Sequence, residues 1–410
     1  MLKRLLAALC CAACMALAGC SFIWPDTSSS QTGSDTFTAP VDQLREYQDK
    51  WCYQRLDGRL QKAYSAVYAA VVKSFSVDET VTITDTGKGE KREYRGVQVA
   101  LPEPLLGEAE AKKLYAAFTR DNPQFFFIGN VYGFDGHQTG GASRFTTFKL
   151  TYVMDAAERR EARIELNAVA DEMADAVPEN ATAFETELAL HDALAARCRY
   201  DTAAAEAPSP AEIDPYAFSA YGAIVQGEAV CEGYARAMQF LLQRADIPAM
   251  VVTGFDENRQ PHMWNLVTID GRNYHLDVTW DDSGDQIRHT YFNLTSREIF
   301  LTHSLDDENM GIDTCIATEA NYFIRTGAYF TTYSLEDIVR VVARQVDSGA
   351  ETIELRFAPD KLQNGLLFIQ QPNWFSSTVS AKLEEGTMWS YDYEVNQTYG
   401  IITIVKKGEG

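Results

Sequence analysis

The chain has 410 residues, of which 46% are hydrophobic and 23% are charged. Because a single hydrophobic core stops growing at roughly 250–300 residues, this length predicts two or three domains, and the composition excludes a wholly disordered or fibrous chain. The net charge of −22, with no basic stripe along the sequence, disfavours nucleic acid as a partner and also disfavours charge-driven binding to anionic lipid headgroups.

The first twenty residues have the pattern of a secretory signal. Lys3 and Arg4 precede an apolar run that ends at Leu17 and is too short for a bilayer core, which takes about 20 helical residues. Residues 17–20, Leu-Ala-Gly-Cys, resemble a bacterial lipobox, which implies removal of residues 1–19 and lipid attachment to Cys20; the alternative is an ordinary signal peptide with a stray cysteine. Residues 20–41 are rich in Ser, Thr, Asp and Gly and predict a flexible tether. We therefore expect an extracytoplasmic protein that is lipid-anchored to a bacterial membrane through Cys20 and does not span it.

The signal changes how the eight cysteines are interpreted. Three lie in the signal and Cys20 is the lipid site, which leaves Cys52, Cys198, Cys231 and Cys315. These four lack the close pairing of zinc ligands, so we predict neither a metal nor a cofactor. Outside the cytoplasm a disulfide between Cys52 and Cys198, or between Cys198 and Cys315, is an option that the sequence does not decide.

Residues 42–176 predict an N-terminal α+β domain without recognisable chemistry. Its expected helices, judged from apolar spacing, are Asp42–Phe75, Glu108–Thr119 and Ala156–Ala176. Its expected strands are Thr80–Thr84, Tyr94–Ala100, Gln124–Gly129 and Phe145–Met154.

The middle of the chain carries the first chemical signal. After a further expected helix at Ala183–Cys198, apolar spacing predicts a helix that starts at or near Cys231 and ends before Pro248. A thiol at a helix N-terminus meets the positive end of the helix dipole and free N–H groups, which favour the reactive thiolate. The alternative role for Cys231 is that of a small buried apolar residue.

A predicted hairpin follows this helix and the strand Ala249–Gly254. Asp270 and Gly271 are typical of a type I′ turn between strands at Met263–Ile269 and Arg272–Trp280. This turn sets His262 opposite Thr279 and Trp264 opposite Asp277, so that His262 and Asp277 are diagonal neighbours on one face. A carboxylate there would orient the imidazole and stabilise its protonated form. By itself, His262 could equally be a structural histidine.

Three motifs in order resemble the transglutaminase-like superfamily, which has a papain-like fold. They are AVCEGYA at 229–235, HMWN at 262–265 and DVTWDD at 277–282, with YGA at 221–223, His191-Asp192 and CRYD at 198–201 upstream. The resemblance covers roughly residues 183–300. It implies that Cys231 is the nucleophile, His262 the general base and acid, and Asp277 the orienting carboxylate. The lipoprotein signal is also similar to that of cell-surface members of the superfamily.

Other candidate residues carry weaker predictions. Gln226 and Tyr221 precede the nucleophile and could supply the second oxyanion donor beside the Cys231 N–H, or they could be a turn residue and a core aromatic. Trp264 could form a wall of the acyl pocket or fill the core. The acidic segments 281–285 and 306–309 do not follow the EF-hand pattern, so solvated loops are favoured over calcium sites.

The remaining sequence predicts a small α+β C-terminal domain. We expect strands at Tyr322–Phe330, Thr352–Phe357, Thr387–Glu394 and Gly400–Val405, with a helix capped by Ser334 and Asp337 that extends to about Val346. The predicted boundaries are 42–176, 177–315 for a transglutaminase-like catalytic domain, and 316–410.

The predicted fold class is therefore α+β: a papain-like core in which a nucleophile helix packs on an antiparallel sheet, flanked by two α+β domains. The predicted function is a membrane-anchored cysteine enzyme that transfers acyl groups from amides of proteins, peptides or peptidoglycan stem peptides through a thioester. Whether water or an amine accepts the acyl group, and so whether the enzyme hydrolyses or crosslinks, stays open. The alternative is a non-catalytic binding or assembly lipoprotein that keeps the fold as a scaffold.

Overall fold

The computed structural model describes residues 49–84, 90–207, 214–284, 286–306, 311–371 and 391–406. The predicted signal, Cys20 and the tether lie outside these ranges. Across the described ranges, no helix combines the length and the apolar character that a bilayer crossing requires. The chain divides into two compact units: the first ends at Ala168 and also includes Phe240–Ile247, and the second holds Val169–Gln239 and the chain from Pro248 onward.

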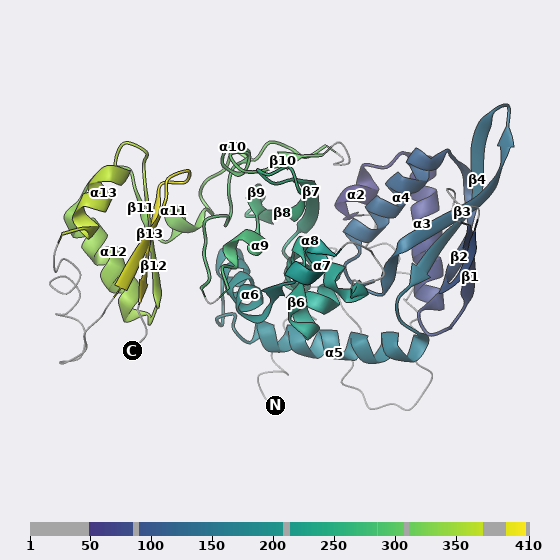
Figure 1. The fold of residues 1–410 in the computed structure, drawn as a ribbon, viewed down its shortest axis with the longest axis horizontal. Coiled ribbons are helices and arrows are strands. Elements are labelled where there is room, and N and C mark those ends of the chain that lie inside the picture. The colour runs from purple at the N-terminus through teal and green to yellow at the C-terminus, as the bar shows by residue number, and fades with distance from the viewer. Residues whose placement is uncertain are drawn as a thin grey trace, which may run out of the picture. The chain divides into compact units, whose positions relative to one another are not determined.

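The first unit packs helices against a four-stranded antiparallel sheet with the order β1-β2-β4-β3 (Figure 1). Its strands are β1 (Thr80–Thr84), β2 (Lys91–Leu106), β3 (Ile128–Thr139) and β4 (Ala142–Tyr152). Its helices are α2 (Trp51–Gln54), α3 (Gly58–Ser74), α4 (Glu108–Asp121) and the first part of α5 (Ala156–Ala174). Aromatic side chains fill its core, where the ring of Phe118 packs against Tyr64, Tyr68 and Phe125.

One buried charge in this unit, that of Arg159, forms hydrogen bonds with backbone carbonyl groups at chain turns. The fully buried Arg159 donates to the carbonyl oxygens of Ser74, Phe75, Val77 and Met154. A buried charge of this kind is tolerated because its hydrogen bonds replace those it made to water. Arg159 therefore fixes the turn after α3 against the end of β4.

Two predicted elements of the first unit are wrong. The single helix expected up to Phe75 is interrupted, because the Asp57 carboxylate accepts from the N–H groups of Arg59 and Leu60 and so starts a new helix. The strand expected at Gln124–Gly129 is a turn instead, and β3 begins only at Ile128. The three phenylalanines at 125–127 are buried, so their apolar run records burial in a turn and not strand pairing.

The second unit contains the predicted nucleophile helix and hairpin. It opens with α6 (Ala183–Arg197), which Thr182 and Glu185 cap reciprocally, followed by β5 (Arg199–Tyr200) and α7 (Thr202–Glu206). Two irregular helical turns, η3 (Pro215–Phe218) and η4 (Gly222–Gln226), precede β6 (Glu228–Ala229) and α8 (Cys231–Arg244). An antiparallel sheet then follows in the order β10-β7-β8-β9, formed by β7 (Ala249–Phe255), β8 (Pro261–Ile269), β9 (Arg272–Leu276) and β10 (Ser304–Leu305).

The hairpin has the predicted turn and register, but its second strand is shorter than predicted. Asp270 and Gly271 both have positive φ, as a type I′ turn requires, and Ile269 pairs with Arg272. The ladder ends at the pair Asn265 and Leu276. Beyond it the chain turns into the one-turn helix α9 (Val278–Asp281), so the strand predicted to reach Trp280 is wrong.

The C-terminal part of the second unit has its own sheet, in the order β11-β12-β14-β13. Its strands are β11 (Tyr329–Phe330), β12 (Thr352–Phe357), β13 (Tyr391–Asn396) and β14 (Ile401–Lys406). The helices α12 (Leu335–Asp347) and α13 (Leu362–Ile369) contact it, and Ser334 caps α12 as predicted. The strand predicted at Tyr322–Phe330 is wrong in its first part, because α11 (Tyr322–Arg325) occupies its first four residues and β11 only its last two. The structure is thus a mixed α+β fold with three four-stranded sheets among the described residues. The first two are antiparallel, and in the third β11 pairs with β12 in parallel.

Candidate active site

Cys231 is the first residue of α8, as predicted from the sequence. The first helical hydrogen bond runs from the Tyr234 N–H to the Val230 carbonyl, so the N–H groups of residues 231–233 are the unpaired donors that every α-helix has at its start. The side chain of Cys231 is half-buried and the thiol is free. The sulfur thus combines access to solvent with the positive end of a helix dipole.

A glycine two residues later lets this helix start approach the preceding chain. A Cβ atom on Gly233 would lie 2.6 Å from the Ala217 carbonyl oxygen and 2.7 Å from the Ala229 Cβ, which are distances that real side chains do not adopt. Only glycine therefore allows the packing that places Cys231.

His262 and Asp277 meet although the ladder ends before either of them. His262 pairs with Gly254 of β7, and Asp277 leaves β9 to cap α9. The His262 Nε2 lies 2.7 Å from the Asp277 Oδ2, while the other carboxylate oxygen accepts from the Trp280 N–H at 3.3 Å. The carboxylate that caps α9 is therefore also the one that binds the imidazole.

The hairpin is tied to α8 by the asparagine of the HMWN motif. The Asn265 side-chain amide donates to the Ala235 carbonyl of α8 at 2.8 Å and is buried. Since His262 lies three residues away on the same strand, this bond helps to set its ring beside the head of α8. The imidazole also lies close enough to Cys231 for the two side chains to interact.

The electrostatics of the pair favour a charged imidazole. Burial lowers the pKa of His262, but the charge and hydrogen bond of Asp277, together with the interaction with Cys231, raise it to about 10. Burial likewise raises the pKa of Asp277, yet the attraction of His262 and the hydrogen bonds from His262 and His303 bring it well below its usual range. The pair is thus an imidazolium and a carboxylate at neutral pH.

A second histidine, which the sequence did not single out, binds the same carboxylate oxygen. The Nε2 of His303 lies 3.0 Å from the Asp277 Oδ2, and its side chain is fully buried. The sequence offered no spacing by which to find it, because His303 reaches the site after the loop and the short helix α10 (Ser296–Ile299).

Trp264 lies buried behind the imidazole, with only 1% of its surface exposed. Its ring is nearly parallel to that of His262, with 6.1 Å between centroids, and its Nε1–H donates to the His275 Nδ1 at 3.0 Å. Burial lowers the pKa of His275 to about 3, so this histidine is neutral and can accept the bond. The Trp264 N–H is therefore already satisfied, and its role as a wall of the acyl pocket stays a prediction.

The predicted oxyanion donors differ in their surroundings. Gln226 is exposed at the end of η4, and Tyr221 packs edge-on against Tyr216. A further tyrosine lies near the sulfur: burial and the charges of Cys231 and Asp277 raise the pKa of Tyr200 to about 12. Tyr200 is 44% exposed on β5, which pairs with β6 just before α8.

Two groups of histidine and aspartate could be considered as metal sites within the described ranges. They are His262, Asp277 and His303, and His191, Asp192 and His289. Ligands on a tetrahedral zinc ion lie roughly 3.3 Å apart, given bonds of about 2.0 Å. The nitrogen–oxygen distances in the two groups are 2.7 and 3.0 Å, and 2.8 and 3.0 Å, which are those of direct hydrogen bonds. Both groups are therefore hydrogen-bonded ion-pair clusters, which fit a metal poorly.

The acidic loop after α9 has structural roles where it is described. Asp281 is buried and accepts from the Tyr291 N–H, and Asp282 accepts from the Tyr234 hydroxyl and the Gly284 N–H. Asp285 and residues 307–309 lie outside the described ranges. The four cysteines that the structure describes, Cys52, Cys198, Cys231 and Cys315, are all free.

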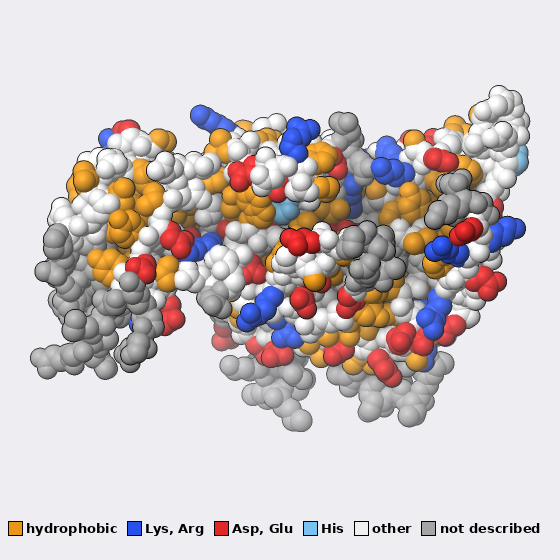
Figure 2. All heavy atoms as spheres, in the orientation of Figure 1, with side chains coloured by type: hydrophobic (Ala, Val, Ile, Leu, Met, Phe, Trp, Pro, Cys, Tyr) orange, Lys and Arg blue, Asp and Glu red, His pale blue; other side chains and the backbone are white. Residues whose placement is uncertain are grey.

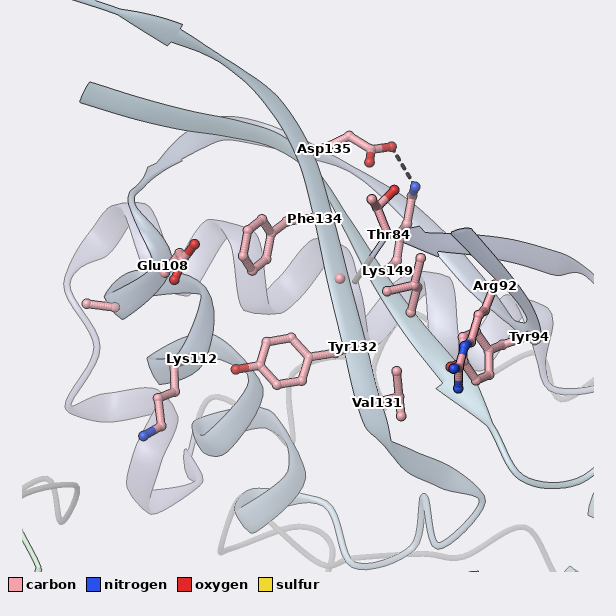
Figure 3. Close-up of a pocket in the computed structure, with 13 residues that line it drawn as sticks. Thr84, Arg92, Tyr94, Glu108, Lys112, Val131, Tyr132, Phe134, Asp135 and Lys149 are labelled. Carbon is pink, nitrogen blue, oxygen red and sulfur yellow. Dashed lines mark ion pairs between the residues drawn. The ribbon is translucent and has the colours of Figure 1, made fainter. Parts of the chain in front are cut away.

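The first unit contains a cavity of about 610 Å³ lined by aromatic and charged side chains (Figure 3). Tyr132 and Phe134 of β3 lie on one side of it, and Glu108 and Lys112 of α4 line it as well. Lys149 is paired with Asp135 at 2.6 Å and also donates to the Thr82 carbonyl. The lining of the cavity includes neither cysteine nor histidine, so the cavity offers no counterpart of the Cys231 site.

Comparison with known proteins found one family match and several matches to solved structures. Residues 168–278 match the model of the transglutaminase-like superfamily, which covers Cys231, His262 and Asp277. No curated protein matches the chain. Among solved structures, a TGase shares 15% identity (TM-score 0.28) over 38% of this chain and 47% of its own. A "putative cysteine protease" from Cytophaga hutchinsonii shares 15% (TM-score 0.22) over 36% and 63%, and a "putative protease" from Parabacteroides distasonis 10% (TM-score 0.22) over 36% of each chain.

The family match defines a class of domain. The chain contains a transglutaminase-like domain, and it spans less than two thirds of each of these solved structures.

Proposed function

We propose that the protein is a cysteine acyl-transfer enzyme of the transglutaminase or peptidase type. The observation that carries the proposal is the 2.7 Å hydrogen bond between His262 and Asp277, formed beside a half-buried cysteine at the head of a helix. Each of the three residues has a chemical role that its surroundings support.

The reaction proceeds in two steps that share one proton carrier. The Cys231 sulfur attacks an amide carbonyl, a C–S bond forms, and His262 gives its proton to the leaving nitrogen as the C–N bond breaks. Water or an amine then attacks the thioester while His262 takes its proton, and the C–S bond breaks to release acid or a new amide. Asp277 keeps the imidazole oriented and stabilises its cationic form throughout.

The tetrahedral intermediates require hydrogen-bond donors for their oxyanion. The N–H of Cys231 is one, because the first turn of α8 leaves it unpaired. Tyr200 is our first choice for the second, since its side chain is exposed and close enough for Cys231 to affect its pKa. Gln226 and Tyr221 remain the alternatives.

We further propose that the enzyme acts outside the cell on proteins, peptides or peptidoglycan stem peptides, anchored by lipid on Cys20. The signal-like start and the acidic composition support this proposal. On the drawn face, Lys and Arg side chains are scattered among Asp and Glu, as Figure 2 shows, which suits a soluble surface more than binding to polyanions.

The first test measures the rate at which iodoacetamide alkylates Cys231 between about pH 5 and pH 9, with the modified residue mapped by mass spectrometry. We expect fast alkylation at pH 5 that His262→Ala slows strongly, because the imidazolium no longer stabilises the thiolate. His137→Ala removes an exposed histidine of the first unit and serves as the matched control.

The result also decides between catalysis and a scaffold role. Alkylation that rises only near the ordinary thiol pKa of about 8.5 and ignores His262 would overturn the proposal and leave a binding lipoprotein. With a reactive thiol, incorporation of a labelled amine into a glutamine-rich protein indicates crosslinking, and ammonia or peptide release without incorporation indicates hydrolysis. Cys231→Ser must abolish either activity, whereas Cys315→Ser, a change at a buried free thiol, must not.

A further inference from the structure

The Asp277 carboxylate oxygen binds two imidazoles, although a Cys–His–Asp centre needs only one. His262 and His303 approach the Asp277 Oδ2 at 2.7 and 3.0 Å, and the rings lie 5.1 Å apart between centroids. A buried carboxylate depends on such donors for its charge, and the hydrogen bond from His303 contributes to the low pKa of Asp277. His303 therefore acts on the group that orients His262.

His303 is in turn held by a hydroxyl chain that leads to the C-terminal sheet. Its Nδ1 lies 2.8 Å from the Thr302 Oγ1, which lies 3.0 Å from the hydroxyl of Tyr399, two residues before β14. The Tyr399 hydroxyl also donates to the Glu298 carbonyl of α10 at 3.2 Å. All four side chains in this path from Asp277 to Tyr399 are buried.

An ion pair fixes the same segment from the adjacent strand. Arg356 of β12 lies 2.6 Å from the Glu298 carboxylate, and Glu298 in turn closes the capping box of α10 with Thr295. The C-terminal sheet thus holds both the helix that precedes His303 and the hydroxyl next to its ring.

We propose that His303 is a positioning residue for the catalytic pair, and that the C-terminal sheet, through Tyr399 and Thr302, is part of the catalytic apparatus. This inference rests on the proposed function. It gives the C-terminal sheet a role that its own sequence did not indicate, namely to keep the carboxylate of Asp277 ionised and aimed at His262.

Other titratable groups also face this cluster, and they set the usable pH range. They are Cys231 from α8, Tyr200 from β5, His275 from β9 and Tyr291 from the loop after α9. His275 stays neutral above about pH 3, and burial raises the pKa of Tyr399 to about 12 and that of Tyr291 still further. Between pH 5 and 9, neither His275 nor these tyrosines contributes a titration of its own.

The test compares alkylation rates of Cys231 at about pH 5 and pH 9 in full-length variants. In His303→Leu, Asp277 loses one of its two imidazole donors and is held less firmly toward His262, so we expect the ratio of the pH 5 rate to the pH 9 rate to fall about 10- to 100-fold. His303→Gln keeps an N–H that can reach Asp277 and must recover most of the ratio. Thr302→Val and Tyr399→Phe should lower it about 2- to 5-fold, since each removes one neutral hydrogen bond.

The matched control is Tyr393→Phe, which removes a hydroxyl of the same sheet that binds only Gln370 among the interactions described for it. It must leave the ratio unchanged. A ratio that stays at the wild-type value in His303→Leu, or falls equally in His303→Gln, would overturn the inference even if the wild type reacts fast at pH 5. A wild type that reacts slowly at pH 5 would instead refute the proposed function, so the two failures are distinguishable.

Discussion

Asp277→Asn tests the charge at the centre while preserving its shape. Asparagine is also a good N-cap residue, so its one side-chain oxygen can keep the cap of α9 at the Trp280 N–H. The substitution therefore removes the negative charge, and it replaces the oxygen that faces His262 and His303 with an amide nitrogen that cannot accept a hydrogen bond.

The size of the effect follows from the pKa of His262. Its increase from 6.5 to about 10 corresponds to a stabilisation of the imidazolium on the order of 5 kcal/mol, at 1.36 kcal/mol per pH unit. This value is a net one, because burial lowers the pKa of His262 while Asp277 and Cys231 both raise it. Loss of even half of it would remove the acidic alkylation of Cys231, and we expect the rate at pH 5 to fall at least about 100-fold.

The charge of Asp277 should also affect the stability of the protein. A raised folded-state pKa makes His262 contribute stability fully below pH 6.5, and this contribution disappears as the pH rises through about 10. The lowered pKa of Asp277 makes its contribution present above about pH 4 and lost as the pH falls through the folded-state value. The difference in unfolding free energy between wild type and Asp277→Asn is therefore expected to be largest between about pH 4 and 6.5.

Urea unfolding at pH 5.5 and pH 10, together with the alkylation rate at pH 5, measures both effects. Asp270→Asn makes the same chemical change at the exposed hairpin turn, where positive φ suits asparagine, and should alter neither quantity. Equal stability losses for Asp277→Asn at the two pH values, or undiminished alkylation at pH 5, would refute the reasoning.

Three further substitutions test the packing around the site. Gly233→Ala should lower the unfolding free energy by about 1–3 kcal/mol in urea and slow the alkylation of Cys231, because its Cβ would overlap the Ala217 carbonyl; an unchanged midpoint would contradict this contact. Arg159→Met should destabilise the first unit by about 3–5 kcal/mol, through the carbonyls it leaves unpaired, without changing the alkylation rate, so a slower rate would argue against independent roles. Glu354→Ala leaves the buried His289 with one carboxylate fewer. It should lower the melting temperature most at acidic pH, where His289 is charged, and a loss that does not depend on pH would contradict this.

Local signals made the helix α8 and the hairpin predictable. The start of α8 at Cys231 follows from apolar spacing. The turn at Asp270 and Gly271 fixes the register of the hairpin, because each residue before the turn pairs with the residue at the same distance after it. Both depend on neighbours within a few residues, whose geometry is nearly independent of the rest of the fold.

The predictions of strands failed where an apolar run is buried but does not pair with a neighbouring strand. The phenylalanines at 125–127 and the apolar residues around Phe323 suggested strands, but the first form a turn and the second a short helix. Apolar content alone does not distinguish a strand from another buried segment of the same length.

The sequence by itself determined the three residues of the proposed centre and the order in which the chain presents them, because a helix start and a hairpin turn are local structures. Only the tertiary structure brought His303 to Asp277 and placed Tyr200 near enough to Cys231 for the pKa of Tyr200 to be affected. Only the tertiary structure also connected Tyr399 to His303 through Thr302. Those contacts join residues up to about a hundred positions apart, and no periodicity records them. They depend on how sheets and loops pack once each has formed, which is decided by burial across the whole unit.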